Sequence, residues 1–227
     1  MTTLYIANNN YSSWSLRPWV LMAQLGIPFD EHRVAFGEGS NWEAFRRFSP
    51  SGRVPCLHDG DTVVWDSLAI MEYLAERHGN VWPSKPEART WARCAAAEMH
   101  SGFSALRNAC GMSCGTRVRL HTMSPALLAD IARINELWNE GLSRFKGPFL
   151  AGNAFTAADA FYAPVVFRIQ TYRLPMEGNV PAFVERMLAL PAMRAWYADA
   201  LAETWRDVAH EDEVRDNGEI IKDFRAR

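Results

Sequence analysis

Apolar positions in the first 80 residues switch twice between the spacing of a strand and the spacing of a helix. Residues 3–7 form a short apolar run that predicts a strand. Apolar residues then recur at helical spacing over residues 19–23 and stop at Gly26-Ile27-Pro28, a typical helix ending. Alternation returns over residues 29–36, which indicates a second strand. This order predicts a βαβ unit with a right-handed crossover.

Three further elements are expected before residue 80. A short helix is predicted over residues 41–48. Residues 54–65 contain two β-type runs around an Asp-Gly-Asp turn, which predicts a hairpin. Pro55 restricts its strand to a sheet edge or to an irregular start, because proline has no N–H to donate. A helix is expected over residues 66–79.

The pattern changes after residues 82–86, Trp-Pro-Ser-Lys-Pro, whose composition is typical of a linker. β-like alternation disappears, and the spacing predicts five helices, over residues 87–109, 125–145, 157–172, 181–190 and 191–205. Thr156-Ala-Ala-Asp159 resembles an N-terminal capping box, with aspartate in place of the usual glutamate.

These elements predict an α/β domain followed by an all-helical domain. The expected boundaries are residues 1–81 for the first domain, 82–86 for the linker and 87–227 for the second domain. The chain is rich in charged residues from about residue 208 to its end. We expect this tail to be a peripheral extension.

Composition and charge are typical of a globular protein in a reducing compartment. The 227 residues are 48% hydrophobic and 22% charged, which is too apolar for a disordered chain. The net charge of -2 argues against nucleic-acid binding and a polybasic membrane anchor. Neither a signal peptide nor an apolar run of roughly 20 residues is present, so we expect a cytoplasmic protein without membrane contact. The four cysteines lack metal spacing, which favours reduced thiols and no metal; a redox or metal pair of Cys110 and Cys114 is the alternative.

A serine-rich segment over residues 11–18 separates the first predicted strand from the first helix. If Ser15 caps that helix, Pro18 falls in the first turn, where its missing N–H is tolerated. Ser12 and Ser13 then lie just ahead of a helix N-terminus, a position that favours anions. A hydroxyl group there can donate to a bound thiolate and lower the pKa of the thiol. Capping and turn formation alone would also explain the serines.

Two other motifs offer groups to a peptide-like ligand. A cis Val54–Pro55 bond would turn the Val54 backbone N–H and C=O outward, where an extended peptide could pair with them. An edge-strand proline is the alternative. Asp66-Ser67 opens the next helix, where the carboxylate could bind an ammonium group while the hydroxyl and helix end bind a carboxylate. Helix capping is the alternative for this pair.

In order and spacing, these motifs resemble a cytosolic glutathione S-transferase over about residues 3–205. The run Ser12-Ser13-Trp14-Ser15 is most similar to the serine-type classes, zeta, theta and tau, especially to the Ser-Ser-x-Ser run of zeta. No tyrosine follows the first strand at the place usual in tyrosine-type classes. The resemblance implies a thioredoxin-like N-terminal domain of βαβ-α-ββα order, an all-α helical-bundle C-terminal domain and a homodimer.

The resemblance also implies how glutathione is held by its central part. Ser12 would hydrogen-bond the glutathione sulfur and keep it as a thiolate, with Ser13 as a competing candidate. Val54, before a cis Pro55, would pair with the cysteinyl backbone.

The two ends of glutathione would meet other residues. Asp66 and Ser67 would hold the γ-glutamyl end, although Asp66 is one methylene shorter than the glutamate more common in the family. Arg53 would lie toward the glycyl end, together with Trp42 or Arg46.

A second-substrate pocket is expected between the two domains. Candidates for its lining are Trp14, Trp42, Met99, Phe103 and Arg107, with helix-core packing as the alternative role for each. Trp14 stands where zeta-like sequences often carry cysteine, which weakens the case for their isomerase activity.

The activity implied by the resemblance is glutathione S-transfer to a small hydrophobic electrophile, with glutathione as co-substrate and no metal. Isomerase, dehalogenase or peroxidase chemistry on the same fold is one alternative. A non-catalytic binding module of the same fold is another, and the intact Ser12, Pro55, Asp66 and Ser67 argue against it. A thiol oxidoreductase is disfavoured because the helix start carries serines and no cysteine.

Overall fold

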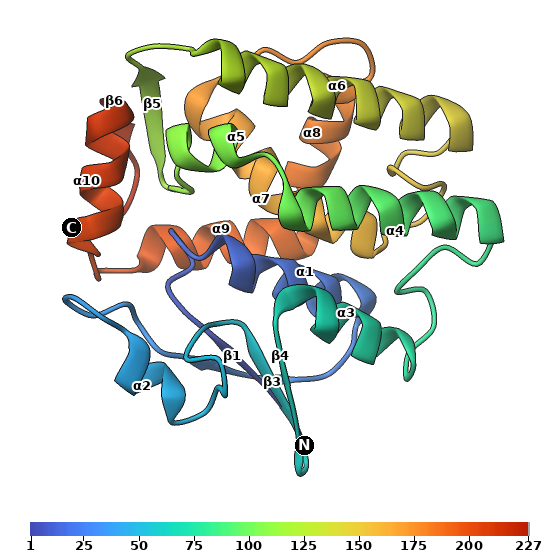
Figure 1. Ribbon diagram of the computed structural model, residues 1–227, viewed down its shortest axis with the longest axis horizontal. Helices are drawn as coiled ribbons and strands as arrows, with labels where there is room; N and C mark the ends of the chain where they lie inside the picture. Colours follow the sequence, from blue (N-terminus) through green and yellow to red (C-terminus); the bar gives the residue numbers. More distant parts are fainter. Residues whose placement is uncertain (227) are drawn as a thin grey trace.

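The computed structural model describes residues 1–226, which form a small mixed sheet with helices and a larger helical layer (Figure 1). The first part contains β1 (Thr2–Ile6), α1 (Ser13–Leu25), β2 (Asp30–Arg33), α2 (Trp42–Arg46), β3 (Cys56–Asp59), β4 (Thr62–Trp65) and α3 (Ser67–Ala75). The second part contains α4 (Pro86–Ser101), α5 (Ser104–Ala109), β5 (Thr116–Leu120), α6 (Pro125–Phe145), α7 (Ala157–Tyr172), α8 (Val180–Ala189), α9 (Pro191–Ala202), α10 (Val208–Asn217) and β6 (Gly218–Asp223). None of the helices within residues 1–226 is long and apolar enough to cross a membrane.

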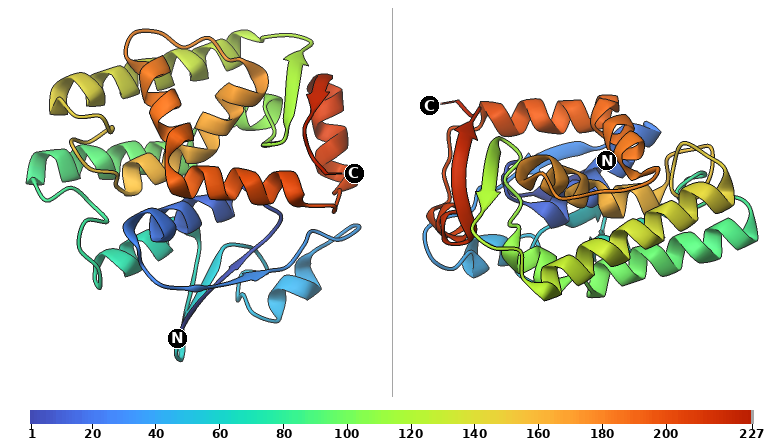
Figure 2. Two further views of the ribbon diagram at one scale, coloured as in Figure 1. Left: turned by 180° about the vertical axis from the view of Figure 1, so that it is seen from behind. Right: turned by 90° about the horizontal axis from the view of Figure 1, so that it is seen from above.

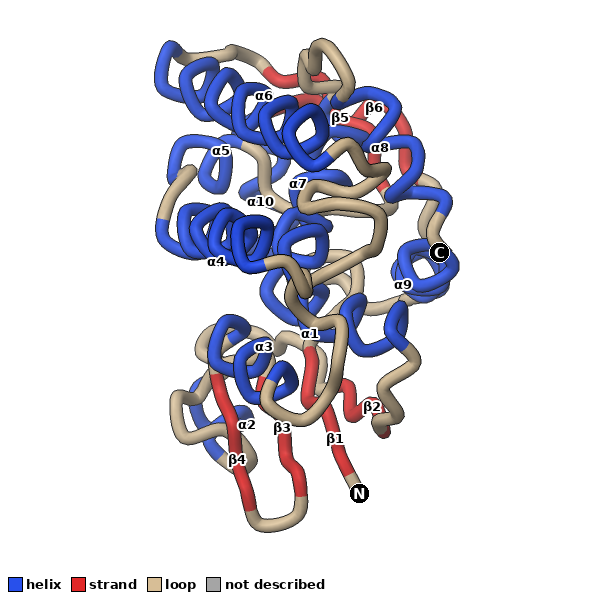
Figure 3. The backbone as a smooth tube through the Cα atoms, turned by 90° about the vertical axis from the view of Figure 1, so that its right-hand side faces the viewer, coloured by secondary structure: helices blue, strands red, loops and turns tan. Residues whose placement is uncertain are grey.

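The four-stranded sheet has the order β2-β1-β3-β4 and confirms the expected thioredoxin-like arrangement. β1 pairs parallel with β2 and antiparallel with β3, and β3 and β4 form the predicted hairpin. Leu4 and Ile6 of β1 are fully buried and belong to the same hydrophobic core as Leu16 and Val20 of α1. Figure 3 shows α1 and α3 lying between the strands of this sheet and the helices of the second part. Pro55 directly precedes β3, so the irregular strand start is the alternative that the structure adopts.

The start of α1 differs from the sequence prediction. Ser12, rather than Ser15, is the N-cap, and Pro18 therefore lies inside the helix. The buried Ser15 hydroxyl instead accepts a hydrogen bond from the Ala7 N–H at 3.3 Å, which ties the end of β1 to α1. A tertiary hydrogen bond has replaced the local cap.

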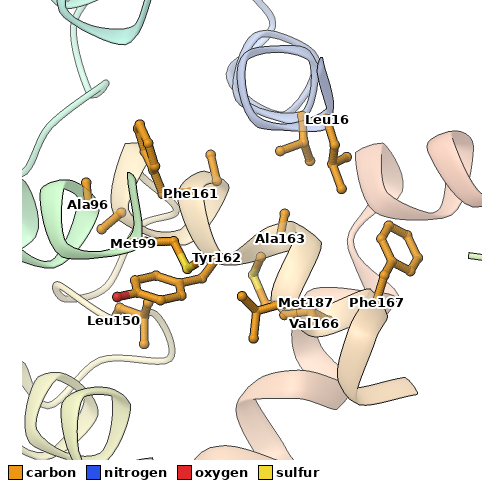
Figure 4. Packing of buried hydrophobic residues seen from close by; sticks show 14 of the residues in the cluster. Leu16, Ala96, Met99, Leu150, Phe161, Tyr162, Ala163, Val166, Phe167 and Met187 are labelled. Carbon is orange, nitrogen blue, oxygen red and sulfur yellow. The ribbon is translucent and has the colours of Figure 1, made fainter. Parts of the chain in front are cut away.

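Helix α7 is the centre of the second part of the chain. It is buried along almost its entire length and packs against α1 on one side and α4 on the other. Figure 4 shows Ala163 of α7 facing Leu16 of α1, and Phe161 and Tyr162 lying beside Met99 of α4. The capping box predicted at its start is present, with the Thr156 and Asp159 side chains each bonding the other's backbone.

The helix predicted over residues 87–109 is broken into α4 and α5, so the single-helix prediction is wrong. Phe103 adopts a left-handed conformation with φ of 58°. A Cβ on Gly102 would lie 2.8 Å from the Glu98 carbonyl oxygen, so glycine allows the chain to turn tightly there.

The second part is helical but contains a two-stranded antiparallel ribbon, so the all-helical expectation needs correction. β5 pairs with β6, which lies about a hundred residues later, and Figure 2 shows this ribbon at one end of the helical layer. The partner strand belongs to the tail, so no neighbouring sequence signals the pairing. α9 ends at Ala202, three residues before the predicted end at Trp205.

The tail is packed into the molecule, so its interpretation as a peripheral extension is wrong. The Arg225 side chain is buried and donates to the carboxylates of Glu211 and Asp223. The Tyr11 hydroxyl donates to Glu211 at 2.5 Å and accepts from Arg225 at 3.0 Å. The tail therefore anchors the residue that precedes Ser12. Arg227 lies outside the described residues.

Candidate functional site

A cavity of about 490 Å³ lies between the two parts of the chain. One wall comes from the β1–α1 junction, α2 and the segment before β3, and the other comes from α5, α7, α10 and the loop after α5. The first wall includes Tyr11, Ser12, Ser13, Trp14, Trp42, Arg53 and Val54. The second wall includes Arg107, Gly111, Met112, Arg168, His210 and Glu213.

Ser12 reaches this cavity from the N-terminus of α1. Its Oγ donates a hydrogen bond to Ser15 Oγ at 2.7 Å, and Ser15 Oγ also accepts from the Ala7 N–H. A hydroxyl group can rotate, so the Ser12 proton that Ser15 accepts here can be donated to a ligand instead. Ser13 also lines the cavity and is nearly buried.

The loop before Ser12 is held by the second part of the chain. The backbone N–H groups of Asn9 and Asn10 donate to the buried Glu203 carboxylate at 2.6 and 3.1 Å. Burial raises the pKa of Glu203, while these two hydrogen bonds oppose the rise. Trp196 Nε1 donates to the Asn9 carbonyl at 2.9 Å. These contacts join residues almost two hundred positions apart and have no sequence signal.

The segment before β3 forms the next part of the first wall. The Val54–Pro55 peptide bond is cis, and both Val54 and the exposed Arg53 line the cavity. Trp42 lies directly on Gly52, where a Cβ would come within 2.4 Å of the indole ring and φ is +62°. Only glycine fits this close approach, which places Trp42 beside Arg53. Arg46 lies over the outer face of Trp42, at 5.4 Å, and is not part of the cavity wall.

Asp66 and Ser67 open α3 outside the cavity wall. Asp66 is the N-cap and accepts from the Leu68 and Ala69 N–H groups at 2.7 and 3.4 Å. Its other oxygen lies 3.5 Å from His100 Nε2. Burial lowers the pKa of His100, although the charge of Asp66 opposes this. The buried Ser67 hydroxyl accepts from Arg17 Nη1 at 3.2 Å.

Arg17 connects Asp66-Ser67 to the cavity. Only 1% of its surface is exposed, and its guanidinium stacks on the Trp14 ring at 4.1 Å and the Phe161 ring at 4.8 Å. Burial holds its pKa well below the usual range, and the nearby charges of Arg107 and Arg168 lower it further.

The cavity lining agrees only in part with the second-substrate candidates from the sequence. Trp14, Trp42 and Arg107 line the cavity, whereas Met99 and Phe103 are buried in the helical core. Arg168, His210 and Glu213 were missed. An arginine inside the most apolar helix was a signal for Arg168, since buried arginines are rare without a partner. His210 and Glu213 lie in a tail whose sequence suggests only a solvated helix.

His210 is fixed against the first wall. Its Nδ1 lies 2.5 Å from the Asp207 carboxylate, and its ring stacks with those of Tyr11 and Phe36. The Asp207 side chain also accepts from the His210 N–H at 3.0 Å, which caps α10. The tail therefore presents an oriented imidazole to the cavity.

The cysteines lie outside the cavity wall. Burial raises the pKa of Cys56 to about 11 and that of Cys110 to about 12. Both thiols are therefore protonated at neutral pH. All four cysteines, Cys110 and Cys114 included, are free thiols in the structure. No cluster of three or more potential metal-binding side chains occurs in the part of the chain that the structure describes.

Comparison with known proteins defines the class of fold and site. A family model for the glutathione S-transferase N-terminal domain matches residues 11–77, and one for the C-terminal domain matches residues 89–199. Glutathione S-transferase theta-1 of Mus musculus is 26% identical over 204 residues, which cover 85% of this chain and 80% of the relative.

Solved structures show the same fold. A glutathione transferase homologue from Burkholderia with bound glutathione superposes with a TM-score of 0.65 at 22% identity, covering 88% of this chain and 97% of that chain. A diazinon-metabolizing glutathione S-transferase of the silkworm Bombyx mori gives a TM-score of 0.70 at 17% identity, with the same coverage of each chain. Both share the thioredoxin-like domain followed by a helical domain. The chain belongs to the glutathione S-transferase family.

Proposed function

We propose that this protein transfers glutathione to an electrophilic small molecule, with Ser12 stabilising the glutathione thiolate. The observation that carries the proposal is the position of Ser12, which is at once the N-cap of α1 and part of the cavity wall beside Val54. The thiolate sulfur attacks the electrophilic carbon and forms a C–S bond. With an aryl chloride, the C–Cl bond then breaks and chloride leaves with the bonding electron pair.

The first wall and the start of α3 together offer partners for each part of glutathione. The Val54 backbone can pair with the cysteinyl residue, as an added strand pairs with a sheet edge. Asp66 and Ser67 lie at the start of α3, where they suit the γ-glutamyl ammonium and carboxylate groups. Arg53, next to Trp42, can meet the glycyl carboxylate.

The energy required is within reach of these groups. Lowering the pKa of a thiol from about 8.5 by two units takes about 2.7 kcal/mol of preferential thiolate stabilisation. A hydroxyl hydrogen bond to an anion contributes about 1.5–3 kcal/mol, and a helix N-terminus about 0.3–1 kcal/mol. A serine at a helix start therefore suffices without a general base.

The direct test compares Ser12→Ala with Ser13→Ala, using glutathione and 1-chloro-2,4-dinitrobenzene. Ser12→Ala should lower kcat by about tenfold to a hundredfold, since it removes one charge-assisted hydrogen bond, while glutathione still binds. Ser13→Ala should have a much smaller effect. Unchanged turnover of Ser12→Ala would contradict the role of Ser12. A wild-type protein that neither binds immobilised glutathione nor reacts would support the non-catalytic alternative.

The homodimer and the cytoplasmic location remain predictions from the family resemblance. Size-exclusion chromatography with light scattering tests the first, because a dimer would have twice the 25.7 kDa mass of the chain.

A further inference from the structure

The charged side chains of the cavity wall are unbalanced. Arg53, Arg107 and Arg168 are opposed by Glu213 alone, apart from the His210 ring. Arg53 belongs to the first wall, where it can meet the glycyl end of glutathione. Arg107 and Arg168 stand on the opposite wall, with no assigned function.

Arg168 is a buried cation without a carboxylate partner. It is 4% exposed and lies on α7, the innermost helix. Its Nε donates to the Cys110 carbonyl at 2.7 Å, and its Nη1 is buried with no hydrogen-bond partner. A buried arginine with an unsatisfied donor is costly, so a ligand that supplies the partner gains affinity from it.

Arg107 on α5 lies beside it in the wall. Its guanidinium stacks on Trp14 at 4.9 Å and donates to the Gly102 carbonyl and the Met99 carbonyl. Within residues 1–226, the side chains of Arg107 and Arg168 thus bond to backbone carbonyls and to no carboxylate. A carbonyl accepts a hydrogen bond but carries no charge to balance the guanidinium.

The positive charges of Arg107 and Arg168 repel each other. Burial, together with the charge of Arg168, lowers the pKa of Arg107 to about 10. Burial likewise lowers the pKa of Arg168, with Glu213 only a minor opposing charge. Arg17, beneath Trp14, adds a third positive charge to the same region.

We propose that the electrophile accepted by this enzyme carries a carboxylate, which binds Arg168 and Arg107 on the second wall of the cavity. This inference rests on the proposed function and specifies its second substrate. The planar guanidinium fork suits a carboxylate better than a point charge would. With the acid group held there, the rest of the molecule lies between the arginines and Ser12, where the glutathione sulfur is expected.

The test uses a matched pair of aryl chlorides, 4-chloro-3,5-dinitrobenzoate and 4-chloro-3,5-dinitrobenzamide. Both react by the same displacement of chloride, and the readout is the ratio of their kcat/KM values, corrected for the uncatalysed rates. The wild-type protein should favour the acid by about tenfold or more, the effect of one charge-assisted hydrogen bond. Equal kcat/KM values for the two probes would overturn the proposal.

Three substitutions test whether Arg168 and Arg107 are the source of the preference for the acid over the amide. Arg168→Gln and Arg107→Gln should each lower the acid-to-amide ratio by about tenfold, whereas Arg168→Lys should keep part of it because the charge remains. Arg194→Gln, an exposed arginine on α9 outside the cavity, is the matched control and should leave the ratio unchanged. A ratio that stays at the wild-type value in both glutamine variants would contradict the assignment. If Arg168→Gln does not fold, Arg168→Lys and Arg107→Gln carry the test.

Failure of the proposed function gives a different result. If no electrophile reacts, calorimetric titration with 4-nitrobenzoate and 4-nitrobenzamide in the presence of S-methylglutathione still tests the anion site. Preferential binding of the acid, lost in Arg107→Gln, would support the site without transferase activity. Equal affinities would overturn it.

Discussion

The two walls of the cavity are built in different ways. The first wall consists of short local motifs at the ends of regular elements, and its chemistry comes from hydroxyl groups, a backbone strand and a helix cap. The second wall carries the long charged side chains of Arg107, Arg168 and Glu213, which come from α5, α7 and α10 and span about a hundred residues of sequence. The proposed function therefore assigns glutathione to residues at the ends of regular elements and the electrophile to side chains from distant helices.

The two walls are nevertheless held together. Glu203 bonds the loop before Ser12, and Glu211 bonds Tyr11 within the first wall. Both glutamates lie beyond residue 199, where the match to the family model ends. The part of the chain outside the family match thus positions the residue proposed to act on sulfur.

The largest effect on stability is expected at Arg225, whose buried side chain pairs with Glu211. Arg225→Met leaves the Glu211 carboxylate buried without its main partner, which typically costs about 3–5 kcal/mol. The free energy of unfolding in urea should fall by that amount at neutral pH, and the double variant with Glu211→Met should recover most of it.

A matched control lies on α10, the helix that carries Glu211. Arg215 is largely exposed and also pairs with Glu211, at 3.4 Å. Arg215→Met should change the free energy of unfolding by less than about 1 kcal/mol, as is usual for exposed ion pairs. A similar loss in both variants would mean that burial of the tail is not the source of its contribution.

Low pH should weaken the contacts of Glu211 with Arg225 and Tyr11. Burial raises the pKa of Glu211, but hydrogen bonds from Arg225 and Tyr11 outweigh burial and hold the pKa below its usual value. The folded state then binds fewer protons than the unfolded state, so the stabilisation is complete above a pH of about 4.3 and is lost as the pH falls through the lowered pKa. The difference in unfolding free energy between wild type and Glu211→Gln should shrink below that pH. A constant difference from pH 7 to pH 3 would contradict this.

The same contrast explains what the sequence could predict. Ser12, Val54 and Asp66 stand at element boundaries, where periodicity and turn chemistry mark their position within a few residues. The prediction of an N-cap at Ser15 was wrong, because the Ser15 hydroxyl accepts a tertiary hydrogen bond from the Ala7 N–H across the loop. β5 was missed because its partner strand is separated from it by most of the helical domain.

The charged tail shows most clearly which contacts cannot be predicted from the sequence. A run of acidic and basic residues usually indicates a solvated surface, and α10 has that composition. Only the fold places Glu211 and Arg225 together against Tyr11, where pairing makes burial tolerable. Charge pairs formed by distant residues leave no local pattern from which they could be predicted.

A smaller effect is expected at Asp66, which lies outside the cavity wall and has two expected roles, as the N-cap of α3 and as a partner of the γ-glutamyl end. Asn caps helices as well as Asp, so Asp66→Asn should leave the stability nearly unchanged. Loss of the charge should raise the KM for glutathione by about tenfold. Asp66→Ala should raise the KM for glutathione by the same factor as Asp66→Asn, and it should also lower the free energy of unfolding by about 1 kcal/mol. If Asp66→Asn changed stability but not the KM, capping alone would explain the residue.

The smallest effect is expected at Ser15, which touches Ser12 rather than the ligand. Ser15 Oγ accepts hydrogen bonds from the Ala7 N–H and from Ser12 Oγ, so it holds the Ser12 side chain in place at the cavity wall. Ser15→Ala removes one neutral hydrogen bond, worth about 1 kcal/mol, so kcat should fall by about fivefold. The pKa of bound glutathione, read from thiolate absorbance, should rise in Ser15→Ala, and Ser15→Thr should restore it. A stability loss without any change in that pKa would make Ser15 a structural residue, and the first wall would then act through Ser12 alone.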